Sequence, residues 1–297
     1  MNVQPEALRL FINIYFFALG AVIGSFLNVC IARLPEGKSL VRPASHCPSC
    51  GSSIRWFDNI PIVSFLLLQG KCRRCGLPIS WQYPAVELLT AILFVLLLQR
   101  FDHAVALVVY LVFASALVVI SFIDLKHYII PNEISIPGIF IGLALSLLPA
   151  RLTGGEFVLP SSFFFLSADP PHVVGSFLNS LIGCLVGGGL LYLTAIFSLL
   201  VFKKEGMGGG DIKLLAMVGA FLGWKLALMT IMLGSALGAI VGITLIILRL
   251  RKRTDYIPFG PYLALAALLS LLYGDQIMQV YLEFGEQINE LVMKVIG

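Results

Sequence analysis

The chain has 297 residues, of which 59% are hydrophobic and 12% are charged, and its mean hydropathy is +0.96. This composition excludes an ordinary soluble protein and predicts a membrane protein that crosses the bilayer several times. The formal net charge of +4 is small and unevenly distributed, so it bears on membrane topology and gives no sign of a nucleic-acid partner.

The first predicted span covers residues 10–32. A cleaved signal peptide is the alternative, because a basic residue precedes the segment and residues 18–20 are rich in small side chains. The apolar run is longer than the hydrophobic region of a signal peptide, which favours a retained helix. Gly20 and Gly24 predict a face for close helix packing, and Asn28 is expected to form a hydrogen bond between helices.

A polar loop follows at residues 33–85, and four of its residues form two C-x-x-C pairs separated by twenty-one residues. Two such pairs are typical of a tetrahedral Zn²⁺ site with four thiolate ligands. A glycine directly follows each pair, as a tight turn around a metal requires. Disulfides are the alternative, but thiols stay reduced in the cytosol, where this loop is predicted to lie. We therefore predict a structural zinc ion bound by Cys47, Cys50, Cys72 and Cys75.

Seven further apolar segments follow the loop, which makes eight predicted spans with the first. Several are short for a bilayer core of about 30 Å, so they are expected to extend into flanking residues or to thin the membrane locally. These segments are residues 86–98, 104–123, 134–148, 175–202, 212–222, 226–248 and 257–272.

The Lys and Arg residues predict the orientation of these spans. With the N-terminus outside, fourteen of them fall in inside loops and five in outside segments, and the opposite orientation reverses this ratio. The N-terminus is therefore predicted to lie outside the cell membrane and the loop at residues 33–85 inside it. Residues 150–174 are then an external loop, which its prolines predict to be irregular.

Two carboxylates are predicted to meet at the inner side of the membrane. Asp124 lies at the inner end of the third span, and Asp211 lies at the inner start of the sixth, after the glycine-rich run at residues 204–211. Two close carboxylates share one proton, so one can accept a proton from water while the other polarises an amide carbonyl. Helix capping by Asp211 is an alternative, as is ion passage through a transporter. Lys213 is expected to extend its amine to the interface.

Several motifs resemble those of type IV prepilin peptidases, in the same order along the chain. Residues 206–211, G-M-G-G-G-D, contain the G-x-G-D signature of intramembrane aspartyl proteases. Asp124 with I-P-N at residues 130–132 resembles the family's first aspartate motif, and P-F-G-P at residues 258–261 is similar to a late element. The amino-terminal motifs are similar to G-S-F-L-N-V at residues 24–29, R-L-P at 33–35, Y-P at 83–84 and E-L-L-T at 87–90.

The resemblance implies two activities. One is cleavage of the leader peptide of prepilins or type II pseudopilins after a glycine, with Asp124 and Asp211 as the catalytic pair. The other is methylation of the new N-terminal residue from S-adenosylmethionine, and a peptidase without this activity is the alternative. Gly70 and Lys71 match positions linked to methyl transfer. Glu87 is expected either to line the methyl-donor site or to be a hydrogen-bonded interfacial acid.

We therefore expect an all-α polytopic protein of the bacterial inner membrane, with about eight transmembrane helices and a periplasmic N-terminus. Three parts are expected: a first transmembrane helix at residues 1–32, a cytosolic zinc-binding loop domain associated with methyl transfer at 33–85, and a membrane-embedded aspartyl protease domain at 86–297. The expected partners are prepilin or pseudopilin substrates and the lipid bilayer, with no nucleic acid.

Overall fold

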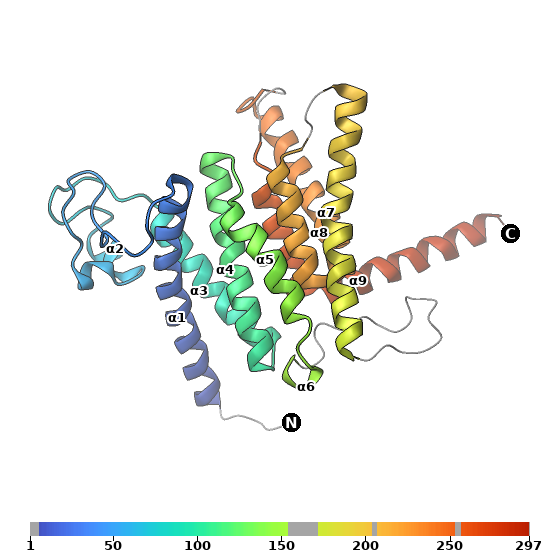
Figure 1. Ribbon diagram of the computed structural model, residues 1–297, viewed down its shortest axis with the longest axis horizontal. Helices are drawn as coiled ribbons and strands as arrows, with labels where there is room; N and C mark the ends of the chain where they lie inside the picture. Colours follow the sequence, from blue (N-terminus) through green and yellow to red (C-terminus); the bar gives the residue numbers. More distant parts are fainter. Residues whose placement is uncertain (1–5, 154–171, 204–206, 253–256, 297) are drawn as a thin grey trace.

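The computed structural model describes residues 6–153, 172–203, 207–252 and 257–296, which are mostly helical and contain no strand. Most of the external loop predicted at residues 150–174 therefore lies outside the described residues. The long helices stand side by side in one bundle, from which the C-terminal part of α9 projects (Figure 1). The described helices are α1 (Glu6–Arg33), α2 (Val63–Leu67), α3 (Gln82–Arg100), α4 (Ala104–His127), α5 (Asn132–Leu145), α6 (Ala150–Thr153), α7 (His172–Phe202), α8 (Gly209–Ile247) and α9 (Gly260–Ile296), with 3₁₀ turns η1 (Leu34–Glu36) and η2 (Trp56–Asn59).

The prediction of an all-α polytopic membrane protein is confirmed. Six of the described helices are long and apolar enough to cross a membrane, namely α1, α3, α4, α7, α8 and α9. All eight predicted segments coincide with helices. Six spanning helices account for eight segments because residues 134–148 match the shorter apolar helix α5, and α8 contains both 212–222 and 226–248. Gly223 interrupts α8 with a φ of 76° and a ψ of 174°, a backbone conformation that strongly favours glycine.

The two halves of α8 have different neighbours. Gly219 in the first half contacts the backbone of Gly183 in α7, and Gly234 in the second half packs on Leu263 in α9. Gly138 of α5 also packs on the first half, against Met217. At 1.5 Å per residue, this first half is about 21 Å long, which is shorter than a bilayer core of about 30 Å. Its first turns lie beside the start of the short helix α5.

The glycine face predicted in the first span is the contact between α1 and α3. A Cβ at Gly20 would lie 2.7 Å from the Cα of Ala91, and one at Gly24 would lie 2.7 Å from the Cα of Glu87. Asn28 donates from Nδ2 to the backbone oxygen of Tyr83 at 3.0 Å, which confirms the predicted hydrogen bond between helices. Small residues thus let the two backbones touch, as in many membrane helix pairs.

Helix α4 lies at the centre of the bundle, between α1 and α3 on one side and α5, α8 and α9 on the other (Figure 1). Its side chains Phe113, Leu117 and Ile120 are fully buried, and the ring of Phe113 stacks on Phe221 of α8 with centroids 4.6 Å apart. Because most of α4 is buried and only a narrow stripe with Val108 and Val112 is exposed along its length, the position of its last turn is set by the bundle. The ends of α1, α4 and α7 lie at the upper side in Figure 1, where the polar loop begins.

Candidate active site

Asp124 lies in the last turn of α4. The helix ends directly after it because Tyr128 adopts a left-handed conformation, with a φ of 57°. The Asp124 side chain is only 3% exposed, and its Oδ2 accepts a hydrogen bond from the backbone N–H of Gly260 at 3.0 Å. A Cβ at Gly260 would lie 2.7 Å from this oxygen. The start of α9 can therefore approach Asp124 only because residue 260 has no side chain.

Asp211 lies in the first turn of α8 and is 4% exposed. Gly208 precedes the helix in an extended conformation, and a Cβ at Gly210 would lie 2.9 Å from the Cβ of Ile130. The glycine run thus permits the N-terminus of α8 to approach the segment between α4 and α5. Of the run at residues 204–211, residues 204–206 lie outside the described residues.

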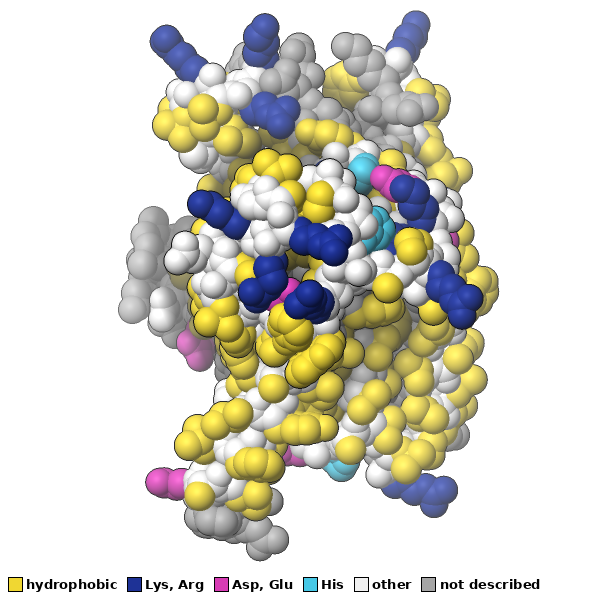
Figure 2. Space-filling model, turned by 90° about the vertical axis from the view of Figure 1, so that its left-hand side faces the viewer, with side chains coloured by type: hydrophobic (Ala, Val, Ile, Leu, Met, Phe, Trp, Pro, Cys, Tyr) yellow, Lys and Arg dark blue, Asp and Glu magenta, His cyan; other side chains and the backbone are white. Residues whose placement is uncertain are grey.

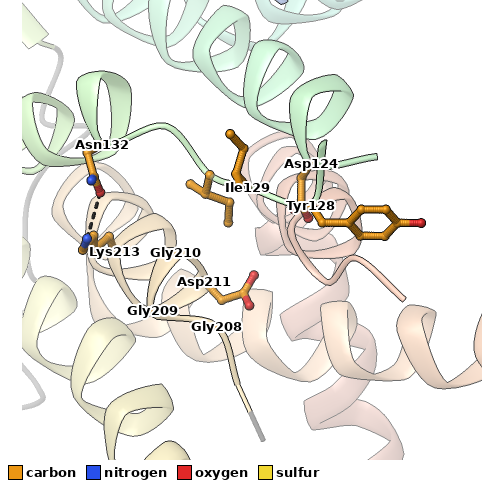
Figure 3. A pocket seen from close by; sticks show the side chains of 10 residues that line it. Asp124, Tyr128, Ile129, Asn132, Gly208, Gly209, Gly210, Asp211 and Lys213 are labelled. Carbon is orange, nitrogen blue, oxygen red and sulfur yellow. Dashed lines mark hydrogen bonds between the residues drawn. The ribbon is translucent and has the colours of Figure 1, made fainter. Parts of the chain in front are cut away.

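Both aspartates line one cavity of about 330 Å³ (Figure 3). They come from different helices, and Tyr128, Ile130 and Gly208–Gly210 complete the wall between them. The predicted meeting of the two helix ends therefore holds in the structure. Two buried carboxylates in one cavity can share a proton and activate a water molecule.

Lys213 also lines this cavity, and the sequence did not predict its partner. Its Nζ donates to Oδ1 of Asn132, the first residue of α5, at 2.8 Å (Figure 3). The amine is thus held by an amide, and it forms no ion pair with Asp124 or Asp211 in the described part of the chain. This bond ties α5 to α8 at the rim of the cavity.

The four cysteines of the loop form one cluster. Their sulfur atoms all lie within 4.8 Å of one another, and Cys47 Sγ is 3.9 Å from Cys75 Sγ. Four sulfurs at 2.3 Å from a tetrahedral Zn²⁺ would be about 3.8 Å apart, so the donor set fits this ion. All four cysteines are free thiols, as a site of four thiolate ligands requires.

The two cysteine pairs have the same backbone structure. The N–H of Cys47 donates to Ser52 at 2.9 Å, and the N–H of Cys72 donates to Leu77 at 2.8 Å. The glycine after each pair has a positive φ, +68° at Gly51 and +70° at Gly76. The turns predicted after the two pairs are therefore present.

The three residues assigned to methyl transfer come from two places, the start of the second cysteine pair and the first turns of α3. Gly70 has a φ of +69° and faces the ring of Phe65, and Lys71 is exposed next to it. Glu87 is buried, and its Oε2 accepts the N–H of Ile62 at 2.7 Å. No ion pair joins Lys71 to Glu87, both of which the structure describes. Their role toward a methyl donor stays a prediction.

Comparison with known proteins agrees with the motifs. Residues 18–101 match the bacterial peptidase A24 N-terminal domain, and residues 111–243 match the type IV leader peptidase family. Proteins named prepilin leader peptidase/N-methyltransferase are similar to the chain. That of Pseudomonas aeruginosa is 38% identical over 90% of this chain and 92% of its own length, and that of Aeromonas hydrophila is 37% identical over the same shares. That of Myxococcus xanthus is 40% identical over 79% of this chain, which spans only 63% of that relative. No solved structure matches the chain.

Proposed function

The chain belongs to the type IV leader peptidase family, and from this premise we propose that it cleaves the leader peptide of prepilins or type II pseudopilins and methylates the new N-terminal residue. One observation carries the peptidase activity: Asp124 and Asp211, 87 residues apart in the chain, line the same cavity at one end of the bundle. The relatives' name supports the second activity.

In the proposed reaction, the carboxyl groups of Asp124 and Asp211 hold one proton between them. The ionised group accepts a proton from water, whose oxygen attacks the carbonyl carbon of the scissile peptide bond. The protonated group donates to the carbonyl oxygen, and a proton then passes to the leaving nitrogen. Gly260 is a positioning residue, because its N–H holds one oxygen of Asp124.

The place of the cavity supports a substrate with a short leader and a long apolar helix. The cavity lies at the ends of α4 and α8, so a peptide bond can enter it while an adjoining apolar helix stays in lipid. We propose that this is the inner face of a bacterial inner membrane, with the N-terminus of the chain in the periplasm. The excess of Lys and Arg in the loops of this side supports the orientation.

We further propose that residues 33–85 are a cytosolic domain that binds a structural zinc ion through Cys47, Cys50, Cys72 and Cys75. S-adenosylmethionine would supply the methyl group when bound. Gly70 and Lys71 lie beside the second cysteine pair, and Glu87 holds the segment before α2, so these residues can orient that face of the domain. Residues 1–32 and 86–297 would then form the first transmembrane helix and the protease domain.

The test is cleavage of a synthetic prepilin peptide by the purified full-length protein in lipid vesicles. Asp124→Asn and Asp211→Asn should each lower the rate by at least about 10²-fold, because neither amide can exchange the proton. Asp102→Asn is the matched control, since Asp102 is exposed between α3 and α4. Near-normal cleavage by either active-site variant would overturn the mechanism. A wild-type protein that leaves the peptide intact would favour a transporter. Mass spectrometry of the cleaved peptide, with S-adenosylmethionine present, would show whether its new N-terminus is methylated.

A further inference from the structure

The segment around α2 lies at the depth of the membrane helices, although it belongs to the polar loop. Ile62, directly before α2, donates its N–H to Oε2 of Glu87 at 2.7 Å. Glu87 is five residues inside α3, or about 7 Å along its axis. Its Cα also faces Gly24 of α1, nine residues or about 13 Å before that helix ends. The start of α2 therefore lies beside the first turns of α3, and α2 lies below the upper end of α1 (Figure 1).

This part of the loop exposes large apolar side chains. Leu67 is 77% exposed, Trp56 is 81% exposed, and Trp81, directly before α3, is 74% exposed. Helix α2 is tied to η2 by a side chain, because Ser64 Oγ donates to the backbone oxygen of Phe57 at 3.0 Å. A set of large apolar side chains exposed in one segment marks an interaction surface. We define the loop apolar patch as Trp56, Val63, Leu66, Leu67 and Trp81.

The loop is also strongly basic. Residues 33–85 contain seven Lys and Arg but only two acidic residues, and both acids are ion-paired, Glu36 with Lys38 and Asp58 with Arg73. Arg42, Arg55, Lys71 and Arg74 form no ion pair within the described residues. In the view of the loop's outer face, Lys and Arg side chains gather at its centre, with hydrophobic side chains directly below them (Figure 2).

We propose that the cysteine loop docks on the membrane itself: the loop apolar patch enters the inner leaflet near α1, and Arg55 and Arg74 bind the phosphates of anionic lipid headgroups. Tryptophan and basic side chains at an apolar boundary are the usual composition of an interfacial element. A partner with a net positive charge would be repelled by these charges. Docking would hold the zinc site close to the membrane surface, independently of the aspartate pair.

The depth of Trp56 gives the first test. Full-length protein that retains Trp56 alone, with Trp81→Phe and Trp224→Phe, is reconstituted in vesicles whose acyl chains carry bromine. The proposal expects bromine to quench Trp56 fluorescence and aqueous iodide to leave it largely unchanged. Strong iodide quenching without bromine quenching would overturn the proposal. Protection from iodide that arises only after a pseudopilin peptide is added would overturn it in favour of a protein partner.

The second test separates the apolar and basic contributions. Leu66→Gln with Leu67→Gln should reduce bromine quenching, whereas Val41→Gln, at an equally exposed apolar residue of the same loop, should not.

Adding phosphatidylglycerol to phosphatidylcholine vesicles should increase the quenching, and Arg55→Gln with Arg74→Gln should abolish this increase. Arg9→Gln at the other end of α1 is the control. Retained zinc shows that each loop variant is folded. Equal quenching in the two lipids would overturn the headgroup contacts.

Discussion

The aspartate cavity and the cysteine loop are held in place in different ways. Asp124 and Asp211 are buried at the ends of helices whose positions are set by the packed bundle. In the loop, Cys47 is buried but Cys50 and Cys75 are exposed, and few other side chains are covered. Packing of the bundle is therefore enough to form the cavity, whereas a loop with so small a core depends on its local turns and on the proposed zinc ion.

Glycine serves the two regions for different physical reasons. In the bundle there is no room for a side chain, because a Cβ at Gly219 would lie 2.0 Å from the backbone oxygen of Gly183. In the loop there is ample room, since a Cβ at Gly51 or Gly76 would meet nothing within 4 Å. These two glycines are needed for their positive φ. The bundle thus uses glycine for close approach, and the loop uses it for turning the chain.

Loss of the metal should unfold the loop and leave the aspartate cavity intact. This loss of folding free energy in the loop is the largest effect expected. Cys72→Ser removes one thiolate, and a structural zinc site contributes about 10 kcal/mol to the folding of a small metal-dependent domain. The loop should lose its zinc, become sensitive to protease and lose methyl transfer, while leader cleavage continues. Metal analysis, limited proteolysis and the two activity assays measure this.

Cys184→Ser is the control for this variant, because Cys184 lies in α7, outside the loop. It should retain zinc and both activities. A Cys72→Ser protein that still holds one zinc ion per chain would contradict the four-thiolate site.

Forcing two helices of the bundle apart should impair the aspartate cavity and leave the cysteine loop unchanged. Gly219→Ala forces α7 and α8 apart, because the new methyl group meets backbone atoms that cannot move alone. Overpacking of this kind typically costs about 1–3 kcal/mol. The thermal unfolding midpoint in detergent and the rate of cleavage should both fall, with zinc binding unchanged. Gly189→Ala in α7 meets nothing within 4 Å and should change neither. Equal effects of the two variants would show that close approach is not the reason for Gly219.

The sequence predicted the parts of both regions that depend on local pattern. Cysteine spacing indicated the cluster of four cysteines, and apolar runs indicated each membrane helix. Asp124 and Asp211 could be placed at one depth because the number of spans between them fixes the side of the membrane. Residues 223–225 separated two predicted segments, and the structure places the break of α8 at Gly223.

Contacts between distant segments could not be predicted in the same way. Nothing in the sequence joins Gly260 to Asp124, since the backbone N–H of any residue but proline could donate that bond. The bond between Ile62 and Glu87 depends on Ile62 adopting a φ of 61°, which is rare for a β-branched residue. Such contacts follow from packing in three dimensions, and strain of this kind is stabilised only by the surrounding structure.

The contact at Gly260 allows a sharper test of the cavity. Gly260→Ala should push the Asp124 carboxylate out of position, because the new methyl group would lie 2.7 Å from Oδ2. A loss of about 1.4 kcal/mol in transition-state stabilisation lowers the rate of cleavage tenfold. Gly209→Ala is the matched control, since Gly209 lines the same cavity and has open space around it. Steady-state cleavage assays of both variants measure the difference, and similar rates would rule out a positioning role for Gly260.

The smallest expected effect concerns the bond between Lys213 and Asn132 at the rim of the cavity. Lys213→Met should lower the rate of cleavage by roughly threefold, since a net hydrogen bond contributes about 0.5–1.5 kcal/mol. Lys126→Met is the control, because it removes the same charge from an exposed residue two positions after Asp124. Asn132→Ala breaks the same bond without changing the charge. If the bond acts by tying α5 to α8, the double variant should be no slower than either single variant. If the losses of cleavage rate in the two single variants add in the double variant, Lys213 acts instead through its charge. Charge would then matter at the rim of the cavity, as it does in the basic loop.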